Sequence, residues 1–81
     1  MAKTTYYVAI PFIRNGFDEL FGLEPVECQS AAQAKSRARE MASAAGNVGA
    51  IAFSRSGDPN LGEFEPAVEL ARYGETPDDL E

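Results

Sequence analysis

Bulky apolar residues gather in a long segment near the N-terminus. Residues 4–14, TTYYVAIPFIR, are rich in β-branched and aromatic side chains and therefore predict a strand. Both faces of this strand are apolar, with Tyr6, Val8, Ile10 and Phe12 on one face and Tyr7, Ala9, Pro11 and Ile13 on the other. Such a strand is typically central in its sheet or covered on both sides. Proline has no N–H to donate, so Pro11 indicates a sheet edge or a bulge at that end.

A turn follows at Asn15 and Gly16, because both residues tolerate a positive φ. The next apolar residues, Phe17, Leu20 and Phe21, have the i, i+3, i+4 spacing of a helix. We therefore expect a short helical turn that places these three side chains on the core as a lid over a sheet edge. The alternative is a mobile binding loop.

Residues 23–28, LEPVEC, predict a weaker second strand. Pro25 again favours an edge position in the sheet. Cys28 is the single cysteine of the chain, which excludes an internal disulfide. With no histidine to activate its thiol, we interpret Cys28 as a small buried side chain and not as a nucleophile.

Residues 30–45, SAAQAKSRAREMASAA, have the periodicity of an amphipathic helix. Ser30 followed by Gln33 is a capping-box pattern, and Gly46 with Asn47 supplies a left-handed C-terminal stop. The apolar stripe consists almost wholly of alanine, which lets a helix backbone approach a sheet closely. Its members are Ala31, Ala34, Ala38, Met41, Ala42 and Ala45.

Basic residues flank the alanine stripe on both sides. Lys35 and Arg39 lie on one side of it and Arg37 on the other. Their aliphatic stems can cover apolar surface while the charges reach water. The functional alternative is a basic docking helix.

The C-terminal half alternates strands with turn-forming segments. Residues 48–55 predict a third strand, residues 56–63 a turn rich in glycine, proline and asparagine, and residues 64–73 a fourth strand. A short helix is the alternative for the last of these, but Pro66 and the hairpin-like loop before it favour a strand. Residues 75–81 are expected to form a mobile acidic tail.

This order predicts an α+β domain over residues 1–74, with the elements in the order ββαββ. We expect a four-stranded antiparallel or mixed sheet, covered on one face by a single helix. One helix leaves apolar side chains on the other face without cover, and a second copy of the chain is an economical way to cover them. A homodimer is therefore predicted, with Tyr7, Ala9 and Ile13 as interface residues.

Charge and composition narrow the function further. The net charge is −6, and residues 56–81 hold eight acidic residues against one basic residue, which argues against nucleic-acid binding. The absence of histidine excludes Ser–His and Cys–His catalytic pairs and the usual zinc sites, so no enzyme, metal or cofactor is expected. The N-terminal apolar run is too short for a secretion signal, and no segment is long enough to span a membrane, which together predict a cytoplasmic protein.

A polar loop after the third predicted strand is the candidate binding site. Arg55, Ser56, Asp58 and Glu63 bring together a guanidinium, a hydroxyl and two carboxylates at the end of a rigid strand. The guanidinium of Arg55 is suited to a bidentate grip on a carboxylate or phosphate. The alternative is that Ser56 and Asp58 hydrogen-bond to their own backbone and shape the turn, while Arg55 pairs with an acidic neighbour.

Two segments resemble a family of short, uncharacterised conserved bacterial proteins. Residues 49–80, GAIAFSRSGDPNLGEFEPAVELARYGETPDDL, are similar to the C-terminal half of these proteins, and residues 6–16, YYVAIPFIRNG, to their start. The shared pattern is GAIAFSR-x-GDP-x-LGEF. The resemblance implies a free-standing bacterial domain and carries no activity, cofactor or catalytic residue.

We therefore expect a small non-enzymatic protein of unknown biological role that acts through protein contacts as a homodimer. One alternative is a small-molecule or anion-binding module that uses the loop 54–63. The other is an RNA-binding sheet, because the aromatic segments YYVAIPF and VGAIAF are similar to strands whose rings stack on bases. That similarity is limited by the negative charge and by the single convincing helix.

Overall fold

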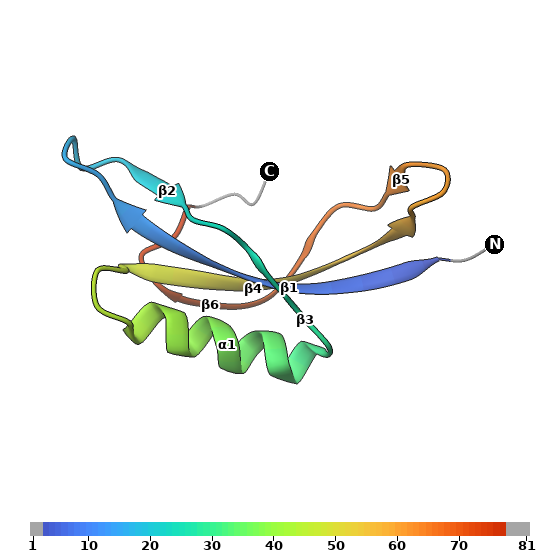
Figure 1. The fold of residues 1–81 in the computed structure, drawn as a ribbon, viewed down its shortest axis with the longest axis horizontal. Coiled ribbons are helices and arrows are strands. Elements are labelled where there is room, and N and C mark those ends of the chain that lie inside the picture. The colour runs from blue at the N-terminus through green and yellow to red at the C-terminus, as the bar shows by residue number, and fades with distance from the viewer. Residues whose placement is uncertain (1–2, 78–81) are drawn as a thin grey trace.

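A helix packs against one face of a curled antiparallel sheet in the computed structural model, which describes residues 3–77 (Figure 1). The elements are β1 (Thr4–Arg14), β2 (Leu20–Gly22), β3 (Val26–Cys28), α1 (Ala31–Ser43), β4 (Gly49–Asp58), β5 (Glu63–Phe64) and β6 (Val68–Gly74). The α+β class is confirmed. The predicted order ββαββ and the predicted four strands are wrong, because the order is βββαβββ and the sheet has six strands.

The two long strands β1 and β4 form the centre of the sheet. They pair antiparallel from Thr4 opposite Gly57 to Phe12 opposite Gly49. Both β2 and β3 pair with the other edge of β1, while β5 and β6 pair with the other edge of β4. The ends of the sheet bend away from α1 (Figure 1), so the sheet has a convex face that carries the helix and a concave face opposite to it.

Pro11 lies in the middle of the sheet, although its type predicts an edge or a bulge. Its carbonyl accepts a hydrogen bond from the N–H of Leu23, on the side of β2 and β3. The nitrogen and carbonyl of one strand residue point to the same edge, so the missing N–H of Pro11 faces that side too. There the outer strand is interrupted between β2 and β3, and no strand partner needs the missing donor.

The sequence sets both ends of α1. The Ser30 side chain accepts a hydrogen bond from the N–H of Gln33 at 3.1 Å, which confirms the predicted N-cap. The helix ends at Ser43, two residues before the predicted end at residue 45. Beyond it, Gly46 has a φ of 90° and the Asn47 side chain donates to the Met41 carbonyl. The hydrogen bond from Asn47 satisfies one of the carbonyl groups that the end of the helix leaves open.

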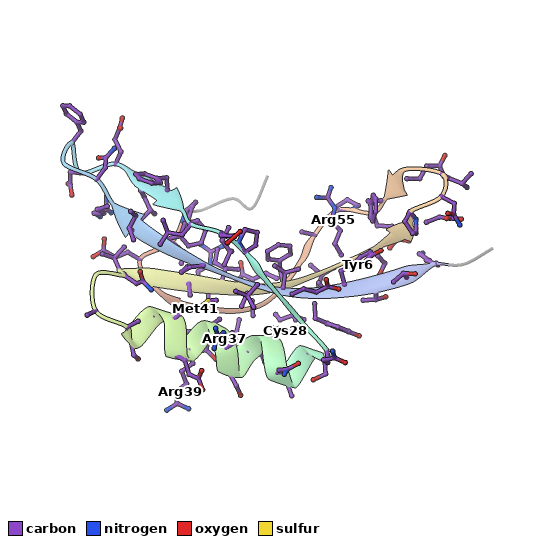
Figure 2. The ribbon with its side chains drawn as sticks, in the orientation of Figure 1. Tyr6, Cys28, Arg37, Arg39, Met41 and Arg55 are labelled. Atoms are coloured by element: carbon purple, nitrogen blue, oxygen red, sulfur yellow. The ribbon has the colours of Figure 1, made fainter. Side chains whose placement is uncertain are left out.

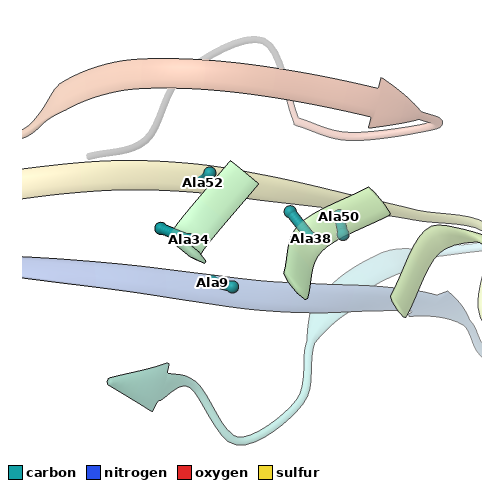
Figure 3. Packing of buried hydrophobic residues seen from close by; sticks show 5 residues of the cluster. All are labelled: Ala9, Ala34, Ala38, Ala50 and Ala52. Atoms are coloured by element: carbon teal, nitrogen blue, oxygen red, sulfur yellow. The ribbon is translucent and has the colours of Figure 1, made fainter. Parts of the chain in front are cut away.

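The core between α1 and the sheet is built from alanine. Its fully buried members come from the helix and from both central strands (Figure 3), and they are Ala9, Ala34, Ala38, Ala50 and Ala52. The predicted stripe is therefore confirmed at its centre, whereas Ala45 is exposed and lies beyond the end of the helix. Because the side chains are so small, the helix backbone lies close to the strands, and larger residues such as Tyr7, Met41 and Leu70 pack around the rim.

The predicted helical turn at residues 17–21 is wrong. A turn at residues 16–18 leads directly into β2, which pairs with the end of β1. The Asn15 side chain accepts hydrogen bonds from the N–H groups of Phe17 and Glu19, and this local bonding competes with a helix. Phe17 is 87% exposed and contributes nothing to the core.

The structure also corrects the element bounds in the C-terminal half. The third predicted strand extends through Asp58, so residues 56–58 are strand and not turn. Strand β6 covers Val68–Gly74, which confirms a strand in place of the helical alternative. Gly74, the last residue of β6, has a φ of 69°, a conformation that favours glycine.

The first residues of the predicted mobile tail fold back onto the domain. The N–H of Glu75 donates to the carbonyl of Val48 at 2.8 Å. The Arg72 guanidinium donates to the Thr76 hydroxyl at 2.9 Å and to the Pro77 carbonyl. Residues 75–77 therefore cover one end of the concave face, and the rest of the predicted tail, residues 78–81, lies outside the described residues.

This covering segment makes Gly49 sensitive to substitution. A Cβ atom at Gly49 would collide with the backbone of Glu75, whereas a Cβ at Gly16 would meet no atom within 4 Å. We expect Gly49→Ala to lower the free energy of unfolding by about 1–3 kcal/mol, because the 75–77 segment must shift. The matched variant Gly16→Ala is expected to change it by less than about 0.5 kcal/mol. Urea unfolding measures both, and equal effects would contradict this packing.

Candidate functional site

The structure separates the residues of the predicted binding loop. Arg55 and Ser56 are neighbours in β4, so their side chains point to opposite faces of the sheet. Arg55 rises from the concave face (Figure 2), whereas the Ser56 hydroxyl lies 2.8 Å from the hydroxyl of Thr5 in β1. The two side chains therefore do not form a single site.

The carboxylates of the loop serve the turn. One side-chain oxygen of Asp58 accepts from the N–H of Asn60 at 2.9 Å, and the Asp58 carbonyl accepts from Leu61 and Gly62. This arrangement fits the Asp58 part of the alternative interpretation, whereas the Ser56 hydroxyl bonds to Thr5 and not to the backbone of the turn. Glu63 stands directly opposite Asp58 in the register of β4 and β5, on the face away from Arg55.

Arg55 is placed beside aromatic rings. It lies opposite Tyr6 in the register of β1 and β4, and the Tyr6 and Phe64 rings are 6.1 Å apart with a tilt of 47°. Its Nε donates to the main-chain carbonyl of Glu65 at 3.1 Å, in place of the predicted pairing with an acidic side chain. The Glu65 carboxylate forms its ion pair with Lys3 instead.

The sequence predicted an uncovered apolar face but not which residues form it, and the residues of the concave face were not predicted as a site. Alternation along β1 and β4 places Tyr6, Val8 and Phe53 on this face, together with Phe64 of β5. Phe64 is 44% exposed, and the other three are partly exposed. We call these four residues, with Arg55, the concave patch.

The other end of the concave face is covered by the chain itself. Gly22 of β2 lies opposite Phe12 in the register of β1 and β2, and a Cβ atom at Gly22 would approach the Ile10 side chain to 2.8 Å. Ile51 lies opposite Arg72 in the register of β4 and β6, and it is completely buried. Among residues 3–77, the buried side chains of this face, Phe12 and Ile51, thus lie toward the end that residues 75–77 cover, and the concave patch lies toward the other end.

The predicted interface residues lie on the face of the sheet that α1 covers. Ala9 is completely buried beneath α1, and Tyr7 packs against the alanine core, so neither offers the surface that was predicted. Ile13 shares their face of β1, because it is separated from them by an even number of residues. The pattern of alternation defines two faces, but it does not say which of them the helix covers.

A polar hollow of about 380 Å³ opens at the β3 edge of the convex face. It is lined by Thr5, Tyr7, Glu27, Cys28 and Gln29. Cys28 and Met41 lie on the helix side of the sheet (Figure 2), and the Cys28 sulfur is 3.7 Å from the Val26 carbonyl. Cys28 is partly buried against the alanine core, as expected for a small packing residue. Within residues 3–77 no three His, Cys, Asp or Glu side chains are grouped so as to hold a metal ion.

Charge is divided between the helix and the rest of the described chain. Helix α1 carries Lys35, Arg37 and Arg39 against Glu40 alone, and the basic side chains lie on its sides and outer surface. The remaining described residues carry nine acidic and four basic side chains. The sheet and its hairpins are therefore acidic, while the outer side of the helix is basic.

Two ion pairs lie along the concave face, and Glu69 of the first pair stands opposite Phe53 in the register of β4 and β6. Arg72 donates to the Glu69 carboxylate at 2.6 Å, and Arg14 donates to the Glu75 carboxylate at 2.6 Å. The hydrogen bond from Arg72 holds the pKa of the Glu69 carboxyl below its ordinary value. The hydrogen bond to Glu75 likewise favours the charged form of Arg14, and it raises the pKa of the Arg14 guanidinium. Both pairs are exposed to solvent, which limits their contribution to stability.

Comparison with known protein families, curated proteins and solved structures finds no match. The resemblance to short conserved bacterial proteins gains no support from these comparisons and stays a prediction. No helix in residues 3–77 is long and apolar enough to cross a membrane. The site must therefore be interpreted from its own geometry.

The Glu69–Arg72 pair predicts a component of acid sensitivity. The pKa of Glu69 is lower in the folded chain than in the unfolded chain. The pair therefore stabilises the fold at pH values above the unfolded pKa. This stabilisation is lost as the pH falls through the folded pKa. We expect Glu69→Gln to make stability fall less steeply between about pH 5 and about pH 3. Urea unfolding at several pH values measures the slope. Glu63→Gln is the control, since Glu63 forms no ion pair within residues 3–77, and an equal change in both variants would contradict this role.

Proposed function

We propose that this chain is a non-enzymatic protein-interaction module and that the concave patch is its contact surface. The observation that carries the proposal is the one-sided cover of the sheet. Within residues 3–77, helix α1 packs on the convex face, while the bulky apolar side chains of the concave patch stay partly exposed on the other face. A sheet whose second face also carries bulky apolar side chains buries that face against another element or another chain.

The composition of the concave patch suits a protein contact. Aromatic residues and arginine are enriched at the centres of protein interfaces, and Tyr6, Phe53, Phe64 and Arg55 supply both kinds. The curled sheet also fixes the patch in a concave shape, because most of the patch residues stand on the paired strands β1 and β4. A floor of this kind loses little conformational entropy when a partner binds.

The chemistry of the whole chain supports binding over catalysis. It has no histidine, and its single cysteine packs beside the core. The carboxylates of the loop 58–63 are engaged in a turn or face away from Arg55. The RNA-binding alternative would use the same rings, but the acidic surface around them repels a phosphate backbone.

Site-specific photo-crosslinking tests the concave patch as a contact surface. Benzoylphenylalanine is placed at Phe53 in the patch or at Phe17, which is 87% exposed at the tip of the β1–β2 hairpin. In the native host we expect a discrete protein adduct from position 53 and none from position 17, because the partner covers the patch and does not reach the hairpin tip. The replaced residue is phenylalanine in both cases, so the two probes differ in position only. No adduct at position 53, or the same adduct at both positions, would refute the proposed function.

One observation favours a second candidate function, the binding of a small aromatic anion. The Arg55 guanidinium lies on the same face as the Tyr6 and Phe64 rings, so a charged group and a stacking surface adjoin each other. Titration with nucleoside monophosphates and aromatic carboxylates is then expected to give saturable amide shifts at Tyr6, Arg55 and Phe64. These shifts should disappear in Arg55→Gln. Amide signals that stay unchanged in the original chain would argue against this candidate.

A further inference from the structure

We infer that the partner segment bound by the concave patch is a short amphipathic α-helix with a basic side chain at each end of its apolar face. This inference rests on the proposed function, because it names the occupant of the same surface. The helix would lie across the strands, over the row in which Val8 stands opposite Phe53. The shape, the width and the charges of the concave face each favour this occupant.

The concave face is a trough that runs across the strands. In Figure 1 the hairpin of β1 and β2 rises at one end of the sheet and the hairpin of β4 and β5 rises at the other. Residues 75–77 cover the first end, so the open part lies between them and the β4–β5 hairpin. A trough accepts a convex surface, and a helix is a cylinder about 10–12 Å in diameter. Helices with an apolar stripe bind in grooves of this kind.

The width of the sheet limits the length of the bound segment. Figure 1 is viewed down the shortest axis, along which the molecule extends 18 Å, and the long strands lie across that view. A helix rises about 1.5 Å per residue, so about twelve residues reach from one edge of the sheet to the other. Apolar residues at i, i+3, i+4 and i+7 of such a segment form a stripe that meets the apolar side chains of the concave patch.

Carboxylates stand at both ends of the row that the helix would cover. Glu27 of β3 is opposite Val8, and Glu69 of β6 is opposite Phe53. Because Val8 and Phe53 are themselves paired, the four residues form one row across β3, β1, β4 and β6. Paired residues of neighbouring strands share a face of the sheet, and both glutamates are exposed. The apolar centre of the row is therefore bordered by negative charge at each edge.

Both carboxylates can pair with a cation from outside the chain. Glu27 forms no ion pair within residues 3–77. The hydrogen bonds from Arg72 to Glu69 both reach the Oε1 atom, which leaves the Oε2 atom for a second cation. Strands about 4.8 Å apart place the two glutamates about 14 Å from each other. Helix residues i and i+11 share a face and are about 16 Å apart, so a lysine or arginine at each of them would reach one carboxylate.

The charge of the sheet as a whole favours the same partner. Outside α1 the described residues carry nine acidic and four basic side chains, whereas α1 is basic and lies on the other face. A basic segment is therefore drawn to the sheet. Arg55 lies one row nearer β5, with its Nε donated to the Glu65 carbonyl. Its other N–H groups can donate to oxygen atoms of the bound helix, so basic groups are required only at the two ends.

Titration with a model peptide tests this occupant. The probe is an alanine-rich peptide of about 17 residues, with leucines at helical spacing and two lysines eleven residues apart on the leucine face. We expect saturable amide shifts at Val8, Phe53 and Glu69 of the isotope-labelled chain. The expected dissociation constant is about 10–100 µM, and it should rise as salt increases from about 50 to about 500 mM. A matched peptide with glutamate in place of both lysines is expected to bind at least about fivefold more weakly.

Paired charge variants separate the two local contacts from the overall charge of the chain. The double variant Glu27→Gln, Glu69→Gln is expected to weaken binding of the lysine peptide by about three- to tenfold. The control is Glu24→Gln, Glu63→Gln, which removes the same charge at exposed positions outside the row and should change binding less than about twofold. Glu27→Gln alone leaves the Glu69–Arg72 pair intact and is expected to weaken binding about twofold. Circular dichroism of each variant shows whether it has folded.

Failure of this inference can be told apart from failure of the proposed function. The absence of shifts at about 1 mM peptide, equal binding of the lysine and glutamate peptides, or equal effects of the two double variants would overturn the helix as the partner. Shifts at Val8 and Phe53 that grow with the concentration of the chain alone would place a second copy on the patch and would overturn it too. In each of these cases a protein adduct from position 53 would leave the proposed function standing.

Discussion

The contact between helix α1 and the central strands depends on alanine on both sides. Ala34 and Ala38 of the helix meet Ala9, Ala50 and Ala52 of the sheet, and all of them are fully buried. Each alanine removes little apolar area from water, so the layer is stabilised by the close approach of backbones and by many short dispersion contacts. A larger side chain in this layer would push the helix away from the sheet.

This thin layer makes the two faces of the sheet unequal. In β4 the bulky residues Ile51 and Phe53 lie on the concave face, while the convex face carries alanine. Residues 75–77 then cover one end of the concave face, beside Gly49. The concave patch lies toward the other end, so the candidate function is a consequence of how the small core is built.

Local patterns in the sequence predict the elements better than they predict the site. The capping residue Ser30, the alanine stripe and the strand-forming run at 4–14 act through neighbours in the chain, and these elements form as expected. Residues 56–58 favour turns, yet the first two of them pair with β1, because pairing across the sheet overrides local preference. The face of the site could not be predicted, since alternation is the same whichever face the helix covers.

The broken outer strands have a consequence for aggregation. A long, flat edge strand is a template on which other chains can polymerise. On one side of this sheet the edge is divided opposite Pro11 into two segments of three residues each. On the other side β6 contains a register shift and the Glu69–Arg72 pair, both of which disfavour an incoming strand. The chain thus protects itself against the edge-to-edge stacking through which small β-rich proteins form fibres.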